Sequence, residues 1–125
     1  MLLKQTLLVN GLATAMTGIA TLVGAPWLPS VLGPASPALL ALIGAGLVVF
    51  AGVLLVQARR ETIDPRVAWT IAVMDVAWVV ASVAVMETGL LTIIGNVVVA
   101  AVAAVVLVFA ILEIRGARAL GTASA

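Results

Sequence analysis

Asp75 is the residue of this 125-residue chain whose type and position most directly indicate chemistry. It lies in the middle of the apolar stretch WTIAVMDVAWVV, residues 69–80, and Trp78 follows it three positions later. Burying an isolated charge is costly, so a carboxyl group in apolar surroundings either has a partner or takes up a proton. Such a group can exchange a proton, bind a cation or form a hydrogen bond to a neighbouring helix. The surroundings of Asp75 therefore decide what it can do.

The composition places these surroundings in a membrane. Hydrophobic residues make up 65% of the chain and charged residues 9%, whereas a soluble domain carries about 25% charged residues. The chain has no cysteine and no histidine, which excludes disulfides, thiol chemistry and the commonest transition-metal ligand. The net charge of +1 gives no indication of nucleic-acid binding. We expect neither a metal nor another cofactor.

Four apolar stretches, each close to the roughly 20 residues that cross a bilayer, predict four membrane-spanning helices. Strands are not expected, because unpaired strand edges are not tolerated in hydrocarbon. Asp64 and Pro65 are typical of a helix start. We predict an all-α fold, a single transmembrane domain formed by an antiparallel four-helix bundle, with a short polar tail at residues 115–125. The predicted spans are residues 6–23, 37–56, 66–86 and 91–112.

The basic residues predict the orientation of the bundle. With four spans, all of them fall on one side, and the positive-inside rule places both termini and the loop between the second and third spans in the cytoplasm. A cleaved signal peptide is a competing hypothesis for the first span, but that span is long and carries polar residues in helical register. The loop is expected to be solvated, with contacts to anionic lipid head groups as the alternative for Arg59, Arg60 and Arg66. The six basic residues are Lys4, Arg59, Arg60, Arg66, Arg115 and Arg118.

In lipid the hydrophobic effect does not drive helices together, so they associate through close packing. Small residues at helical spacing therefore predict which helix faces pack together. The third span aligns Ala68, Ala72, Asp75 and Ser82 on one face. Similar stripes occur in the first span (Asn10, Gly11, Thr14, Ala15, Thr17, Gly18 and Thr21), the second (Ala41, Gly44, Ala45 and Gly52) and the fourth (Asn96, Ala100, Ala103 and Ala110).

The inward faces predict an intramembrane polar site that runs from the midplane toward the outer surface. An ionised carboxylate at the bilayer centre costs about 2.5–3.5 kcal/mol, and no basic residue lies in the middle of a span, so we expect the neutral acid. One hypothesis is a site that exchanges a proton or binds a cation. The other is a protonated side chain that joins helices by a hydrogen bond to Asn10, Thr14 or a backbone carbonyl. The candidate site residues are Asp75, Thr14, Trp78, Ser82 and Asn96.

Signatures of catalysis are absent. The sequence has no phosphate-binding loop, nucleophile elbow or zinc-ligand spacing. Glu87 and Glu113 fall near the ends of their spans, so no second carboxyl group is expected beside Asp75 within the membrane. We therefore predict that the protein is not an enzyme; one acting on a lipid or a quinone ranks lowest, because a lone carboxylate lacks a partner.

Three segments carry a resemblance to known proteins: PWLPSVLG after the first span, GAGLVVFAGVLLVQARR closing the second, and AWTIAVMDVAWVVASV in the third. Together they resemble small bacterial inner-membrane proteins of four spans, and the size and topology are distantly similar to those of the DoxX-like group. The resemblance implies a multi-pass protein of the bacterial inner membrane and no particular reaction. Small multidrug transporters differ, because they carry an acidic residue in the first span. Fluoride channels differ as well, because Phe50 and Phe109 stand alone on separate spans.

Two functions remain in competition. The first is a membrane-embedded binding or assembly protein, such as a lipid-binding module or an accessory subunit of a larger membrane complex. The short loops favour it, as does the expectation that four short spans enclose little volume. The second is a small transporter or channel that uses Asp75 for proton or cation coupling. That function favours a homo-oligomer, because a single four-helix bundle is narrow.

Overall fold

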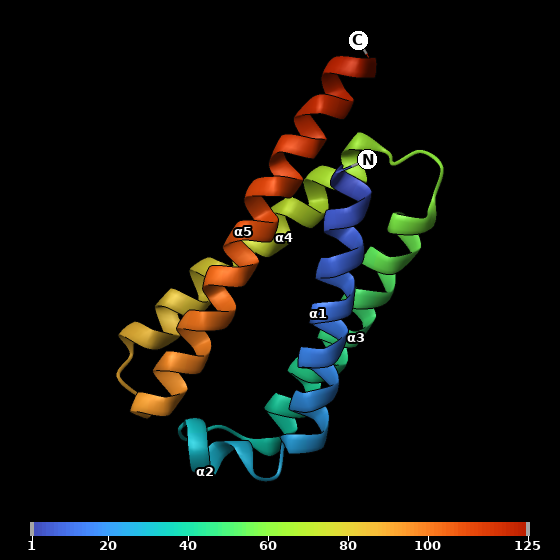
Figure 1. Cartoon of the computed structure of the whole chain (residues 1–125). Helices are drawn as coiled ribbons and strands as arrows, with labels where there is room; N and C mark the ends of the chain where they lie inside the picture. Colours follow the sequence, from blue (N-terminus) through green and yellow to red (C-terminus); the bar gives the residue numbers. More distant parts are fainter. Residues whose placement is uncertain (1, 125) are drawn as a thin grey trace.

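All secondary-structure elements in the described part of the chain are helices. The structure is a computed structural model that describes residues 2–124, with side chains described through residue 120. Four of the helices are long and apolar enough to cross a membrane, so the prediction of an all-α, multi-pass membrane protein is confirmed. The helices are α1 (Leu2–Gly24), α2 (Leu28–Leu32), α3 (Pro37–Arg59), α4 (Pro65–Glu87) and α5 (Ile93–Ser124) (Figure 1).

Two of the long helices begin at a capping residue followed by proline. The Ser36 hydroxyl accepts a hydrogen bond from the Leu39 backbone N–H at 3.4 Å, and the Asp64 carboxylate accepts one from the Arg66 N–H at 2.9 Å. Each cap satisfies a backbone donor that the first helical turn leaves unpaired. The predicted start of the third span at Asp64 is therefore confirmed.

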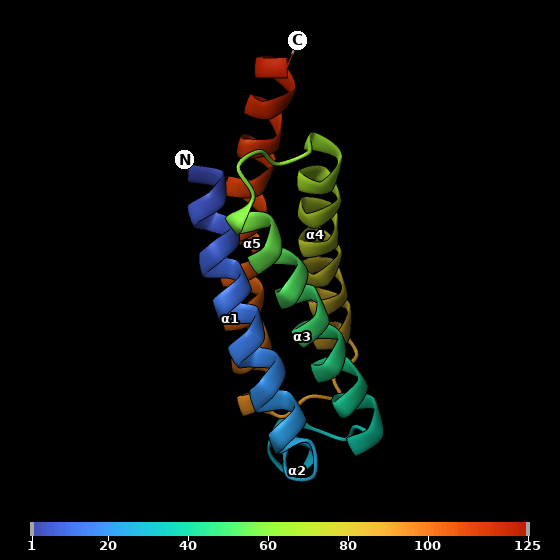
Figure 2. The ribbon, with the colours of Figure 1, turned by 90° about the vertical axis from the view of Figure 1, so that its right-hand side faces the viewer.

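The bundle consists of two antiparallel hairpins. Helix α1 packs along α3, and α4 packs along α5, as both views show (Figures 1 and 2). Gly18 and Gly44 bring the first pair together: a Cβ atom on Gly44 would lie 2.8 Å from the Gly18 carbonyl oxygen. In contrast, α3 and α4 are consecutive in the chain but make few contacts. The bundle is therefore more open than the sequence predicts.

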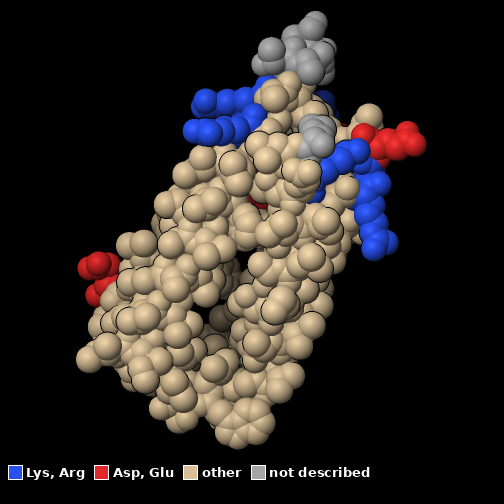
Figure 3. Space-filling model, in the orientation of Figure 1, with Lys and Arg blue, Asp and Glu red and all other residues tan. Residues whose placement is uncertain are grey.

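The hairpins meet firmly at the end of the molecule that carries the basic side chains, which we call the basic end (Figure 3). The Lys4 ammonium group donates a hydrogen bond to the Glu61 carbonyl oxygen there, at 2.7 Å. A buried apolar core with residues from all four long helices lies at this end. Interiors of this kind are close-packed. The core consists of Leu3, Leu7, Leu54, Ile63, Ala68, Ile71 and Ala117.

A backbone clasp joins the hairpins at the opposite end, which we call the α2 end. The Thr92 N–H donates a hydrogen bond to the Leu32 carbonyl oxygen at 2.9 Å, and the Thr92 hydroxyl donates one to Val31 at 2.6 Å. Gly33 allows this approach for two reasons. Its φ of 135° is one that glycine adopts and other residues rarely do. A Cβ atom on this residue would also lie 2.7 Å from the Leu90 carbonyl oxygen. The segment between the first two spans thus contains a short helix that holds α5.

The predicted polar tail at residues 115–125 differs from the structure, in which α5 continues to Ser124. Ala117 is fully buried, and Gly116 lies so close to α1 that a Cβ atom there would be 2.8 Å from Leu3 Cδ1. Packing against the start of α1 therefore keeps this segment helical beyond the predicted end of the span. Residue 125 lies outside the described residues.

The first prediction concerns the glycine contact between α1 and α3. We expect Gly44→Ala to lower the free energy of unfolding by about 1–3 kcal/mol, because the added methyl group overlaps backbone atoms that cannot move away. Gly52→Ala on the same helix is the matched control, since a Cβ atom there would meet no atom within 4 Å. Unfolding by dodecyl sulfate, followed by far-ultraviolet circular dichroism, measures both. Equal stability of the two variants would contradict the packing described here.

Candidate functional site

A buried amide joins two carboxyl groups at the centre of the candidate site. The Asn10 Nδ2 amide group donates hydrogen bonds to Asp75 Oδ2 at 2.8 Å and to Glu113 Oε2 at 2.9 Å. The Thr14 hydroxyl donates to Asn10 Oδ1 at 2.9 Å, which turns the amide so that its two N–H bonds face the acids. The exposed fractions of Asn10, Asp75 and Glu113 are 1%, 4% and 0%. Helices α1, α4 and α5 therefore meet at one polar contact.

The charge of this contact follows from its composition. The two carboxyl groups accept hydrogen bonds from the same amide nitrogen and therefore lie close together in the interior. Two carboxylates side by side in an apolar interior repel strongly, so such a pair retains a proton. We expect the pair of Asp75 and Glu113 to share one proton and to carry one negative charge at most.

The prediction that no second carboxyl group accompanies Asp75 is wrong. The predicted fourth span places Glu113 near its inner end, but α5 is longer than that span and brings Glu113 level with Asn10 and Asp75. The signal was present in the sequence. Ala103 and Ala110 of the predicted small stripe are buried, and the same stripe reaches Glu113 three residues later.

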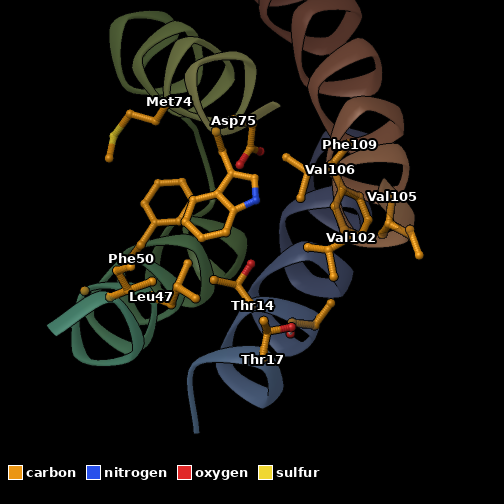
Figure 4. Close-up of a pocket in the computed structure, with 15 residues that line it drawn as sticks. Thr14, Thr17, Leu47, Phe50, Met74, Asp75, Val102, Val105, Val106 and Phe109 are labelled. Atoms are coloured by element: carbon orange, nitrogen blue, oxygen red, sulfur yellow. The ribbon is translucent and has the colours of Figure 1, made fainter. Parts of the chain in front are cut away.

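A cavity of about 550 Å³ lies between the four long helices, on the side of this contact that faces the α2 end. The expectation that four short spans enclose little volume is therefore wrong. The hairpins touch mainly near their ends, so the middle of the bundle stays open, and the space-filling view is hollowed between them (Figure 3). Asp75 and Thr14 are polar residues of the wall, and most of the remaining wall is apolar (Figure 4).

Aromatic side chains from three helices line this cavity. Phe50 comes from α3, Trp78 from α4 and Phe109 from α5. The two phenylalanines, which stand on separate spans in the sequence, therefore face the same space. The Trp78 Nε1–H group is buried without a hydrogen-bond partner among the described residues. An unsatisfied buried donor costs about 1–3 kcal/mol.

The structure brings together only part of the predicted polar site. Asp75, Thr14 and Trp78 line one cavity, whereas Ser82 and Asn96 do not. The Ser82 hydroxyl donates to the Trp78 carbonyl oxygen of its own helix at 2.8 Å, and Asn96 Oδ1 is buried with no hydrogen-bond partner in the described part of the chain. The polar contact therefore extends from the middle of α4 toward the basic end, through Asn10 and Glu113, and not toward the α2 end.

A second groove, of about 370 Å³, lies between α3 and α4. It shares Gly46, Phe50 and Met74 with the cavity, so the two spaces adjoin where these helices stand apart. Arg66 lines the groove at its basic end, while Arg59 and Arg60 are exposed near the end of α3. A contact of these arginines with lipid head groups stays a prediction.

No known protein family, curated protein or solved structure matches this chain. The class of the protein is therefore defined by its own features. It is a multi-pass membrane protein whose four long helices surround an apolar cavity with a buried carboxyl pair at one end. The resemblance to the DoxX-like group stays a prediction.

The second prediction concerns Asn10. We expect Asn10→Leu to destabilise the protein by about 1–3 kcal/mol, because it leaves two buried carboxyl groups without their shared donor. Gln5→Leu is the control: it replaces an exposed amide on the same helix and should change stability little. Dodecyl sulfate unfolding reports both. An Asn10→Leu variant as stable as Gln5→Leu would show that the bridge contributes nothing to the fold.

Proposed function

We propose that the protein is a membrane-embedded binding protein whose central cavity holds a small lipophilic molecule. The cavity of about 550 Å³ between the four long helices carries this proposal. Sites for small molecules measure about 300–1,000 Å³ and combine apolar walls with a few polar groups. Protein interiors are otherwise close-packed, since a void loses the dispersion contacts of the atoms that line it. An occupant would restore these contacts.

The polar groups of the wall restrict the ligand. Asp75 and Thr14 contribute oxygen atoms to the wall near the basic end. A ligand with an apolar body and one polar end satisfies both kinds of wall. A membrane lipid or a lipophilic molecule dissolved in the bilayer has this form.

We also propose that the protein lies in the bacterial inner membrane with both termini in the cytoplasm. Supporting this orientation, α1 begins and α5 ends at the basic end, where the loop between α3 and α4 also lies (Figure 1). Basic loops remain on the cytoplasmic side during insertion.

The third prediction tests this orientation with single cysteines, since the chain has none of its own. Thr62→Cys in the loop between α3 and α4 should react with a membrane-impermeant maleimide only after the cells are permeabilised. Ala35→Cys, before α3, should react in intact cells. Both positions are exposed. The reverse pattern of labelling would refute the proposed orientation.

The fourth prediction tests the cavity. A Cβ atom at Gly46 would meet no atom within 4 Å, and Gly46 lines the cavity. We expect Gly46→Leu to fill this space and to weaken binding of the neutral fluorophore N-phenyl-1-naphthylamine at least about tenfold, a loss of about 1.4 kcal/mol. Fluorescence titration of the purified protein in nonionic detergent, corrected with protein-free micelles, measures the affinity.

Gly52→Leu is the matched control for the fourth prediction. Gly52 lies on the same helix, has the same open surroundings and does not line the cavity. This variant should bind the fluorophore as the wild-type protein does. If Gly46→Leu also binds as tightly as the wild type while remaining folded, the cavity is not the binding site.

A second candidate function is transport coupled to protons or cations. The observation in its favour is the buried pair of Asp75 and Glu113, which can hold a proton beside the cavity. Transport requires that protein in liposomes moves a solute or protons and that Asp75→Asn stops this movement. Binding without movement across the bilayer would favour the first function.

A further inference from the structure

The carboxyl pair is arranged in two layers relative to the cavity. Asp75 lines the cavity, whereas Asn10 and Glu113 lie behind it and do not reach the wall. Figure 4 shows the Asp75 side chain reaching from α4 into the space between the helices. Glu113 is fully buried, and its Oε1 atom has no hydrogen-bond partner among the described residues. A molecule in the cavity therefore meets one carboxyl group directly, with a second behind it.

The charge that the cavity presents follows from the groups on each surrounding helix. Helix α1 contributes the neutral residues Thr14 and Thr17 to the wall, with Asn10 behind them, and the cavity residues of α3 are all apolar. Helix α4 contributes Asp75 to the wall, and α5 contributes Glu113 behind it. Since two adjacent carboxyl groups retain at least one proton between them, the wall presents at most one negative charge. Glu113 is fully buried behind the wall, so a proton held there leaves Asp75 able to meet a cation as the anion.

We infer, on the basis of the binding function proposed above, that the ligand is a lipophilic cation with one positive charge, held with that charge at Asp75. One positive charge neutralises the wall without a remaining charge in the membrane interior. Two positive charges, or a negative one, would leave a net charge in apolar surroundings, where it is costly. Glu113 acts as a positioning residue, because it retains the proton and leaves Asp75 available as the anion.

The aromatic residues of the wall support a cation. Trp78, Phe50 and Phe109 come from three helices and line the same cavity as Asp75. The faces of aromatic rings attract cations, more strongly where water is excluded. A delocalised organic cation with an apolar surface fits this wall better than a hydrated inorganic ion, since a strongly hydrated ion would lose its water to an apolar surface.

The test compares two ions of nearly equal shape and opposite charge, tetraphenylphosphonium and tetraphenylborate. Each displaces bound N-phenyl-1-naphthylamine from the detergent-solubilised wild-type protein, and the displacing concentration is corrected for partition into protein-free micelles. We expect tetraphenylphosphonium to bind at least about tenfold more tightly than tetraphenylborate. This comparison uses the wild-type protein and does not depend on the folding of a variant.

Variants then identify the residue that gives the preference for the cation over the anion. Asp75→Asn should abolish it, because the remaining carboxyl group does not reach the cavity. Glu113→Gln should reduce it less, since Asp75 still lines the wall. Glu87→Gln is the control, because Glu87 is exposed at the α2 end of α4, and it should bind as the wild type does.

The outcomes separate the two proposals. If the fluorophore binds and Gly46→Leu weakens it, but the two ions compete equally or the anion competes better, the inference of a cationic ligand is wrong and the binding function stands. A preference for the cation that persists in folded Asp75→Asn would also overturn the inference. If neither the fluorophore nor either ion binds to the wild-type protein, both proposals fail.

Discussion

The Asn10 amide is the contact on which the arrangement of the bundle depends. It is the point where the first hairpin, α1 and α3, is joined to the second, α4 and α5, by polar bonds within the membrane. The bridge fixes the rotation of three helices at once, since Asn10, Asp75 and Glu113 must all face inward. Apolar packing alone specifies rotation weakly in lipid, because helix surfaces and lipid tails are equally apolar. The polar contact therefore determines which side chains surround the cavity.

The sequence predicts the local structure of this fold well. Length and apolarity identify the four long helices, Asp64 with Pro65 identifies the start of α4, and the small stripe identifies its inward face. Ala68, Ala72, Asp75 and Ser82 are all buried as predicted. These features depend on neighbouring residues in one helix and on the solvent, which the sequence specifies directly.

The remaining features depend on how separate helices are placed. Predicting the inward position of Glu113 requires the length of α5 and its axial position relative to α1. Predicting the cavity requires the separation of two hairpins that touch near their ends. Phe50 and Phe109 illustrate the same difficulty, because residues on different helices converge only when both rotations are known. Spacing within one helix carries no information about such distances between helices.

The open seam between α3 and α4 has a consequence for how the cavity is supplied. The groove along this seam adjoins the cavity at Gly46, Phe50 and Met74, and its flanking residue Val49 is 69% exposed on a surface that the bilayer covers. If the protein binds a ligand as proposed, a molecule already dissolved in the acyl chains would enter sideways, without crossing a head-group layer or water. Its concentration at the entrance is set by partitioning into the lipid, so even a modest intrinsic affinity suffices for occupancy.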